Sequence, residues 1–532
     1  METHNNHIKR WILPEPINND EILDCQVNYI LQTVLTRRGI NLNEGLINYL
    51  IPLELPDPEA HFDQLNKVTQ RIIEACQRKE KIAICGDYDA DGITSTVLLV
   101  ELLSKLGAKP ISFIPSRLDE GYGLNLKMVD DIYSKEINLI ITVDNGISAF
   151  DAIRRSNELD IDLIITDHHK IPNCSLDIFA LIHPEKTPEY SPYKYLAGVG
   201  IAYMIARNLC HKLNYDINQT TANVLFCIGT IADMAPLIGA NRKWLKDCLP
   251  KIKETNNVAI RTIIKKLALD DTEISSEDIG YKIAPLINAV GRIGNPKLIV
   301  DFLTDTSESS IKKRAKQIFF LSQQRKSLTA LIEKEALKIA ANEYADNSQF
   351  LVLINSDWHP GVIGIVAARI VEKYNLPTAL LSQANDGTFR GSIRSNNQLK
   401  VNLALQECTE ILETHGGHSA AAGFSIKEEN IPKLKEMLNK IAKREFIDCN
   451  LSKSIKPEAY ISLKDINDEF YRQLTLMGPF GIMNIAPIFW TRKCKVIELH
   501  SLKGNHLKMI LDDGTGFIDA IKWNNSSHLK VN

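Results

Sequence analysis

Three short apolar runs in the first half of the chain constrain its fold most, because each ends on acidic residues or on paired histidines. The runs are Lys81–Cys85, Leu139–Val143 and Leu163–Thr166, and a segment of helical character follows each. Short β-branched runs that alternate with helices predict buried parallel strands of an α/β sheet. Ligands bind such sheets beyond the carboxyl ends of the strands. The residues expected to gather on that rim are Asp87, Asp89, Asp91, Asp144, Asp167, His168 and His169.

This acidic rim predicts a metal site. Clustered carboxylates repel one another unless cations neutralise them, and a mixture of Asp and His favours divalent ions, here two. In an extended chain Asp89 and Asp91 would face the same side, and a helix would begin near Ile93. One such motif alone could equally be an Asp-rich capping turn. Three acidic rims in one sheet favour the metal site.

The other candidate site residues would each be interpreted differently if considered alone. Asp144 in Val-Asp-Asn-Gly would by itself be a turn residue, but opposite Asp89 and Asp91 it is a candidate bridging ligand. The adjacent His168 and His169 diverge, so one can bind a metal while the other faces a substrate. Asp233 lies in an apolar helical run, where a buried acid needs a partner. Taken singly, Asp233 is more often structural than functional.

Composition bounds the class of protein. A length of 532 residues suggests three to four domains at ~150 residues each, and the net charge of −3 gives no global sign of nucleic-acid binding. A nucleic-acid-binding protein could still carry local clusters of basic residues at this net charge. The ten cysteines include no CxxC pair, which fits a reducing cytoplasm. Residues 1–14 lack a signal-peptide core, and the apolar stretch 97–106 is too short to span a membrane.

The second half predicts another α/β unit and a small β-barrel. A three-or-four rhythm from Ile311 to Ile339 predicts a long connecting helix. Beyond it we expect strands at 350–354, 378–382 and 388–394, a helix over 361–374, and a hairpin turn at Asn385–Gly387. Strands at 487–490, 495–499, 506–511 and 516–521 suggest the barrel. The expected domain boundaries are 1–70, 71–240, 241–345, 346–450 and 451–532.

Several residues of the second half suit phosphate binding. His359 precedes Pro360, which fits the first turn of a helix. Gly416 and Gly417 expose bare backbone N–H groups before His418, and Arg390 and Arg394 flank Gly391 and Ser392. Each feature alone would more often be a capping turn or a solvated charge. Their density around two glycine-rich loops favours a nucleotide-binding face.

Eight motifs together resemble the DHH phosphoesterase superfamily and, within it, the RecJ family of single-strand-specific exonucleases. They are CGDYDADG at 85–92, VDNGIS at 143–148, DHH at 167–169, IAD at 231–233, NAVGR at 288–292, WHPGVIGIVA at 358–367, GSIRS at 391–395 and GGHSAAAG at 416–423. The resemblance covers about residues 70 to 525. Cys85 stands where the pyrophosphatase branch of the superfamily carries histidine, which favours the RecJ branch.

The resemblance implies a fold and a set of site residues. The fold is α/β, with a DHH and a DHH-associated domain joined by a long helix, plus a C-terminal OB-like β-barrel. Two Mn²⁺ or Mg²⁺ ions would be held by Asp89, Asp91, Asp144, His168 and Asp233, with Asp144 bridging and His169 contacting the scissile phosphate. Substrate would be bound by Asn288, Arg292, His359, Arg390, Ser392, Arg394, Gly416, Gly417 and His418.

The barrel expected from the resemblance would stack bases on aromatic side chains and track the backbone with lysines. Phe489, Trp490 and Trp523 are available for stacking, although each aromatic singly would more often fill the core. RecJ proteins continue with further strands, whereas this sequence stops at Asn532. We therefore expect a shortened barrel.

The resulting hypothesis is a metal-dependent 5′→3′ exonuclease that degrades single-stranded DNA to mononucleotides in DNA repair and recombination. By resemblance, its partners would be a helicase and single-strand-binding protein, in the cytoplasm and away from membranes. Two alternatives stay open. A DHH phosphoesterase of short oligonucleotides or cyclic dinucleotides would share both catalytic halves but would need neither the N-terminal segment nor the β-rich C-terminus. A non-catalytic nucleic-acid scaffold would typically have lost metal ligands, and every expected ligand is present.

Overall fold

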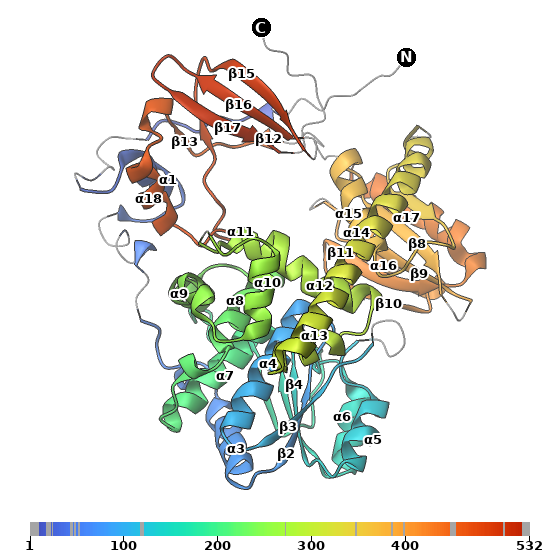
Figure 1. Cartoon of the computed structure of the whole chain (residues 1–532). Coiled ribbons are helices and arrows are strands. Elements are labelled where there is room, and N and C mark those ends of the chain that lie inside the picture. The colour runs from blue at the N-terminus through green and yellow to red at the C-terminus, as the bar shows by residue number, and fades with distance from the viewer. Residues whose placement is uncertain are drawn as a thin grey trace.

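The computed structural model describes residues 10–17, 23, 25–42, 46, 49–51, 54–116, 122–271, 273–345, 348–384, 387–396, 399–446, 454–503 and 506–523. It contains two α/β units joined by a long helix, and a β-rich part to which both ends of the chain contribute (Figure 1). The predicted α/β class with two units is therefore confirmed. Two expected features, the start of the turn at Asn385 and the chain end after Trp523, lie outside the described residues.

The first unit is a five-stranded parallel sheet in the order β3-β2-β4-β5-β6. Its strands are β2 (Lys81–Cys85), β3 (Lys109–Phe113), β4 (Leu139–Val143), β5 (Asp162–Thr166) and β6 (Ala180–Ile182). Its helices are α3 (Leu65–Gln77), α4 (Ala90–Lys105), α5 (Leu126–Ser134), α6 (Phe150–Glu158), α7 (Gly198–Lys212) and α8 (Ala222–Ala232). The sequence did not reveal β3, which contains Pro110. Proline is tolerated there because β3 is an edge strand.

Alternate residues of β2 pack into two different cores. Ile82 and Ile84 join the cluster that contains residues of α3, α4 and α7, whereas Ala83 and Cys85 join the cluster under α5 and α6. A parallel sheet covered by helices on both faces needs apolar residues on both sides of each strand. This requirement explains the uninterrupted apolar runs, and it leaves only the strand ends for polar side chains.

The stretch of chain that connects the two units is helical. Its helices are α9 (Gly239–Cys248), α10 (Val258–Lys266), α11 (Ser276–Asp278), the π-helical turn η6 (Ile279–Ile283), α12 (Ala284–Ile293), α13 (Lys297–Thr304) and α14 (Glu308–Ala345). The predicted connecting helix is confirmed as α14. Its first half contributes Ile311 and Ile318 to the core of the first unit, and its second half contributes Ile332 to a core of the second unit. Because α14 is anchored in both cores, it sets the position of one unit relative to the other.

The second unit is a mixed five-stranded sheet in the order β10-β11-β9-β8-β7, in which only β7 and β8 pair in parallel. The strands are β7 (Leu351–Ile354), β8 (Thr378–Gln383), β9 (Phe389–Arg394), β10 (Thr414–Gly417) and β11 (Ala421–Ile426). The helices are α15 (Ile363–Tyr374), α16 (Val401–Glu407) and α17 (Ile431–Glu445). Helix α15 begins two residues later than expected from Gly361.

The remaining part combines the two ends of the chain. Helix α1 (Tyr29–Arg37) shares a core with α18 (Asp468–Leu476), and β1 (Arg10–Trp11) pairs with β12 (Ser454–Ile455). The C-terminal strands are β13 (Ala459–Tyr460), β14 (Phe489–Trp490), β15 (Lys495–Leu502), β16 (His506–Asp512) and β17 (Phe517–Lys522). Among the described residues these strands form a pair, β13-β14, and an open antiparallel sheet, β15-β16-β17, and do not close into a barrel.

Within the described part of the chain, no helix combines the length and the apolar composition that crossing a membrane requires.

Candidate metal centre and substrate cleft

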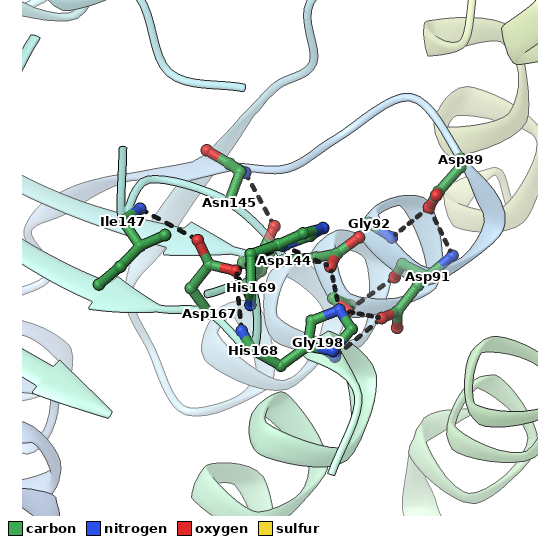
Figure 2. A network of polar contacts seen from close by, with 12 residues as sticks. Asp89, Asp91, Gly92, Asp144, Asn145, Ile147, Asp167, His168, His169 and Gly198 are labelled. Atoms are coloured by element: carbon green, nitrogen blue, oxygen red, sulfur yellow. Dashed lines mark hydrogen bonds and ion pairs between the residues drawn. The ribbon is translucent and has the colours of Figure 1, made fainter. Parts of the chain in front are cut away.

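The carboxyl ends of β2, β4 and β5 bring the predicted acidic and histidine residues together (Figure 2). Asp87 and Asp89 follow β2, Asp144 follows β4, and Asp167 with the two histidines follows β5. The C-cap of α8 adds Asp233. Three groups of residues each offer ligand atoms within 4.8 Å of one another: Asp87, Asp89 and Asp144; Asp91, His168 and Asp233; and Asp144, His168 and His169.

The local geometry of Asp89 and Asp91 differs from the prediction. The extended arrangement with both carboxylates on one side is wrong, because α4 begins at Ala90 and not near Ile93. The Asp89 side chain caps this helix, accepting from the backbone N–H of Asp91 (3.0 Å) and Gly92 (3.1 Å). Asp91 therefore lies in the first turn, and the two carboxylates fall into different ligand groups.

Asp91 is held by the start of a second helix. Its two carboxylate oxygens accept from the backbone N–H groups of Gly198 (2.8 Å) and Val199 (2.7 Å) at the N-terminus of α7. The positive end of a helix stabilises a carboxylate in this position. Gly198 also allows α7 to approach Asp144, since a Cβ atom there would lie 2.4 Å from the Asp144 Cβ.

Asp144 occupies a strained and buried position. Its φ of 62° is in the left-handed region, which non-glycine residues seldom adopt. Its N–H donates to the Thr166 carbonyl (3.0 Å), and its own carbonyl accepts from the Tyr122 hydroxyl (2.8 Å). These two bonds fix the backbone. The carboxylate belongs to two of the three ligand groups and lies 3.0 Å from His168 Nε2.

The electrostatics of the cluster fit bound cations. Burial, followed by repulsion from Asp91, Asp89, Asp233 and Asp87, raises the pKa of Asp144 well above its usual value. Burial and neighbouring aspartates likewise raise the pKa of Asp91 to about 7 and that of Asp233 to about 9. Crowded carboxylates of this kind bind divalent cations, which remove the repulsion. The donor set of oxygen and imidazole nitrogen suits Mn²⁺ or Mg²⁺.

The pKa values of the two histidines are shifted in opposite directions. Burial and the neighbouring His169 lower the pKa of His168 to about 3, which keeps it in the neutral form that binds metals. Burial alone would lower the pKa of His169, but its hydrogen bond to Asp167 and the nearby aspartates raise it above the usual value.

Asp167 positions His169. Its Oδ1 accepts from His169 Nδ1 (2.7 Å) and from the backbone N–H groups of His168 and His169, and its Oδ2 accepts from the N–H of Ile147. His183 donates from Nε2 to the His169 carbonyl (2.7 Å). With Nδ1 engaged in this way, the other ring nitrogen, Nε2, lies 3.2 Å from the Tyr122 hydroxyl.

A cleft of about 950 Å³ separates this cluster from the second unit. One wall carries Asp87, Asp89 and Asp233, and α12 contributes Asn288 and Arg292. The opposite wall contains predicted substrate-binding residues, namely Arg390, Ser392, Arg394, Gly416, Gly417 and His418. The rings of His418 and His169 stack across it with centroids 6.1 Å apart. Arg390, Ser392 and Arg394 alternate along β9 and so share one face of that strand.

Two predicted substrate-binding residues have local structural contacts, and of these Asn288 lines the cleft whereas His359 does not. The Asn288 side-chain oxygen accepts from the backbone N–H of Ala90 (2.8 Å), so α12 holds the loop that carries Asp89. Close packing continues one turn later, where a Cβ at Gly291 would lie 2.1 Å from the Tyr88 carbonyl oxygen. His359 Nδ1 accepts from Gly361 N–H (3.0 Å), which is the capping alternative considered for it.

Two residues of the site are absent from the predicted metal ligands and substrate-binding residues. Asp87 lies on the expected rim and shares a ligand group with Asp89 and Asp144, although the family resemblance does not include it among the metal ligands. The Asp-x-Asp-x-Asp spacing was the available signal. Tyr122 lines the cleft and contacts the His169 ring with centroids 5.6 Å apart. Because it lies in a loop far from the strand motifs, no sequence pattern pointed to it.

Three protein-family models match separate stretches of this chain. The DHH family N-terminal domain matches residues 81–230, the DHHA1 domain residues 347–444 and the RecJ OB domain residues 458–532. Fold and site together thus define a protein of the DHH family.

Individual relatives narrow the assignment. Single-stranded-DNA-specific exonuclease RecJ of Bacillus subtilis is 31% identical over 97% of this chain and 66% of its own length. The Haemophilus influenzae protein of the same name is 30% identical over 87% of this chain and 84% of its own. The crystal structure of Thermus thermophilus RecJ with Mn²⁺ superposes with a TM-score of 0.83 at 26% identity, covering 98% of this chain and 75% of that one. The chain belongs to the RecJ family.

Proposed function

We propose that this protein is a metal-dependent exonuclease that degrades single-stranded DNA from the 5′ end to mononucleotides. The observation that carries the proposal is the buried carboxylate cluster, joined by Asp144, which faces a cleft with arginine and glycine-rich backbone on its other wall. Such a pairing of a cation-binding wall with an anion-binding wall suits a phosphodiester. Single-stranded DNA is proposed as the substrate because the names of the relatives specify it.

Two divalent ions would be held by residues of the first unit. Asp87, Asp89 and Asp144 would hold one, and Asp91, His168 and Asp233 the other, with Asp144 between them. Ions in such a site neutralise phosphate oxygens and lower the pKa of bound water. The Mn²⁺ complex of the Thermus thermophilus relative supports this choice of ion, and a Mg²⁺ complex of that relative matches with a TM-score of 0.76.

The chain's own groups would bind and orient the phosphate. His169, whose raised pKa favours the imidazolium form, would donate from Nε2 to a phosphate oxygen while Asp167 fixes its ring. Arg390 and Arg394 would bind phosphates from the opposite wall, and the backbone at Gly416 and Gly417 lets the strand approach closely. Donors fixed before the reaction stabilise charge as it develops on the phosphate.

The remaining features of the proposal follow from family membership. The 5′→3′ direction, the release of mononucleotides and a role in DNA repair and recombination come from the resemblance to RecJ proteins, as do a helicase and single-strand-binding protein as partners. A cytoplasmic location is supported by the nine described cysteines, all of which are free thiols.

The test is digestion of 5′-labelled and 3′-labelled single strands, and of the matching blunt duplex, in Mn²⁺ and in EDTA. We expect immediate release of a labelled mononucleotide from the 5′ end only, dependent on metal and absent on the duplex. Inactivity on long strands with turnover of di- or trinucleotides would overturn the proposal in favour of a small-substrate phosphoesterase.

A further inference from the structure

Two cysteine thiols meet in the core of the first unit, outside the metal centre. Cys227 lies within α8 and is 0% exposed, and Cys248 is the last residue of α9 and is 5% exposed. Their side chains are hydrogen-bonded to each other. Neither thiol has a part in the proposed cleavage of a phosphodiester. Two thiols in contact are the starting point of a disulfide, in which the sulfur atoms are about 2 Å apart.

The surroundings of Cys248 favour its thiolate. Burial raises the pKa of Cys76, Cys210 and Cys408 to about 11, as expected for thiols in an apolar core. The pKa of Cys248 is lowered instead, above all because Cys227 donates a hydrogen bond to its sulfur. Burial and the same hydrogen bond raise the pKa of Cys227 well above its usual value. The pair therefore combines a nucleophilic sulfur with a thiol that keeps its proton.

An arginine adds positive charge beside the pair. The Tyr203 hydroxyl lies 3.6 Å from the Cys248 sulfur and 3.4 Å from Arg207 Nη1. The Arg207 guanidinium lies over the rings of Tyr203 and Trp244, 5.7 Å and 5.9 Å from their centroids. Positive charge near a cysteine stabilises the thiolate, which is the form that reacts with oxidants.

A surface pocket leads to the pair. It has a volume of about 720 Å³, and the residues that line it include Arg207, Cys210, Trp244 and Asp247. Asp247 immediately precedes Cys248 in the chain. A molecule as small as hydrogen peroxide can therefore come within one residue of the buried thiol.

We propose that Cys227 and Cys248 are a redox-active pair that hydrogen peroxide converts into a disulfide, and that this disulfide slows the reaction at the metal centre. The second part rests on the proposed function. It adds a control to that function and leaves the cleavage chemistry itself unchanged.

The oxidation takes two steps. The Cys248 thiolate attacks one peroxide oxygen, the O–O bond breaks and hydroxide leaves, so that Cys248 becomes a sulfenic acid. The Cys227 sulfur then attacks the Cys248 sulfur, the S–O bond breaks, and water leaves with the Cys227 proton. Two electrons pass from the thiols to the peroxide. A thiol reductant reverses the disulfide by exchange.

Helix α8 connects the pair to the metal centre. Cys227 lies within about two turns of Asp233, the C-cap of the same helix and a candidate metal ligand. Helix α8 also packs on α4, whose first turn carries Asp91. A disulfide draws the two sulfurs together to about 2 Å and so shifts α8 relative to α9. Displacements of about 1 Å at a reacting centre are enough to reduce turnover strongly.

The test treats the full chain with hydrogen peroxide in the absence of metal, and catalase removes the peroxide before Mn²⁺ is added. Peptide mapping under non-reducing conditions locates the disulfide, and turnover of a labelled single strand is measured before and after treatment. We expect a cross-link between Cys227 and Cys248 and a fall in turnover of about tenfold or more. Dithiothreitol should restore the turnover.

Variants separate this pair from other oxidation. Cys227→Ser and Cys227→Ala should keep the turnover of the reduced protein and lose the response to peroxide. Cys210→Ser is the control and should respond like wild type, because it removes a buried thiol that lines the same pocket.

Three results would overturn the proposal. Treated protein without the cross-link would remove the redox-active pair, and cross-linked protein with wild-type turnover would remove its control of the metal centre. An equal loss of turnover in the Cys227 variants would place the damage at another residue. The cross-link is detected by mass and without nucleic acid, so its absence is distinguishable from failure of the exonuclease assignment.

Discussion

The two walls of the cleft differ in how deeply their functional side chains are buried. On the wall of the first unit, Asp87 and Asp91 are 1% exposed and Asp144 is 2% exposed, and the Asp91 carboxylate is held by two backbone N–H groups. On the wall of the second unit, Arg390 and His418 are exposed to solvent. One wall is fixed before any substrate arrives, whereas the other is open to it.

This difference separates two tasks. Divalent ions require ligands within a few tenths of an ångström, which demands burial and a rigid frame. A strand that moves after each cleavage requires contacts that form and break repeatedly, which suits exposed arginine and bare backbone. Substitutions on the first wall should therefore affect turnover or folding, and substitutions on the second should affect mainly substrate binding.

The largest effect is expected for Asp144→Asn. The amide keeps the size of the side chain but removes the charge that two of the three ligand groups share, so turnover should fall about a thousandfold while strand binding is retained. Cleavage kinetics in Mn²⁺ and fluorescence anisotropy provide the two readouts. Asp151→Asn on the surface of α6 should behave as wild type. Near-normal turnover of Asp144→Asn would remove Asp144 from the metal site.

Gly198→Ala tests the rigid frame of the same wall. Alanine normally stabilises a helix relative to glycine, but here its Cβ would meet Asp144. We expect destabilisation of about 1–3 kcal/mol, measured by urea unfolding, together with weaker metal binding. The matched control is Gly280→Ala, whose Cβ would find its nearest neighbour, Ile231 Cγ2, at 3.7 Å. Equal stability of the two variants would contradict the close packing of α7 on Asp144.

Arg390→Ala tests the open wall. Loss of one phosphate contact should raise KM for a single strand about tenfold and leave kcat within about threefold of wild type. Steady-state kinetics on a labelled strand separate the two constants. Arg154→Ala, which removes an exposed arginine of α6, serves as control. A large fall in kcat with unchanged KM would show that the two walls do not divide their tasks in this way.

The smallest effect concerns pH. Carboxyls must lose their protons to bind metal, and the raised pKa values of Asp91 (about 7) and Asp233 (about 9) keep protons on them near neutrality. Mn²⁺ affinity, measured by calorimetry, should therefore increase several-fold between about pH 6 and about pH 8. Asp233→Asn should bind Mn²⁺ more weakly and with a shallower pH dependence. An affinity independent of pH would contradict the crowding of these carboxylates.

The C-terminal part shows which structural features a sequence pattern cannot predict. The predicted strands appear as β14 to β17, but alternation alone gives neither their partners nor closure into a barrel. The association of α1 with α18 was equally invisible, because the two helices are separated by more than four hundred residues and amphipathic patterns do not identify partners. In contrast, α14 was predictable because its rhythm extends over many turns.

The order of residues along the chain is enough to predict which residues end the strands of the first sheet, because buried parallel strands leave polar side chains only at their ends. It therefore determined that Asp89, Asp144 and His168 would meet on one rim. The division of the carboxylates into ligand groups comes instead from three-dimensional packing, since it depends on the first turn of α4 and on the N-terminus of α7. The same packing makes the positions of further residues unpredictable from the strand pattern. It also decided that Tyr122, Asn288 and His418 face the same centre, because their positions result from packing between segments far apart in the chain.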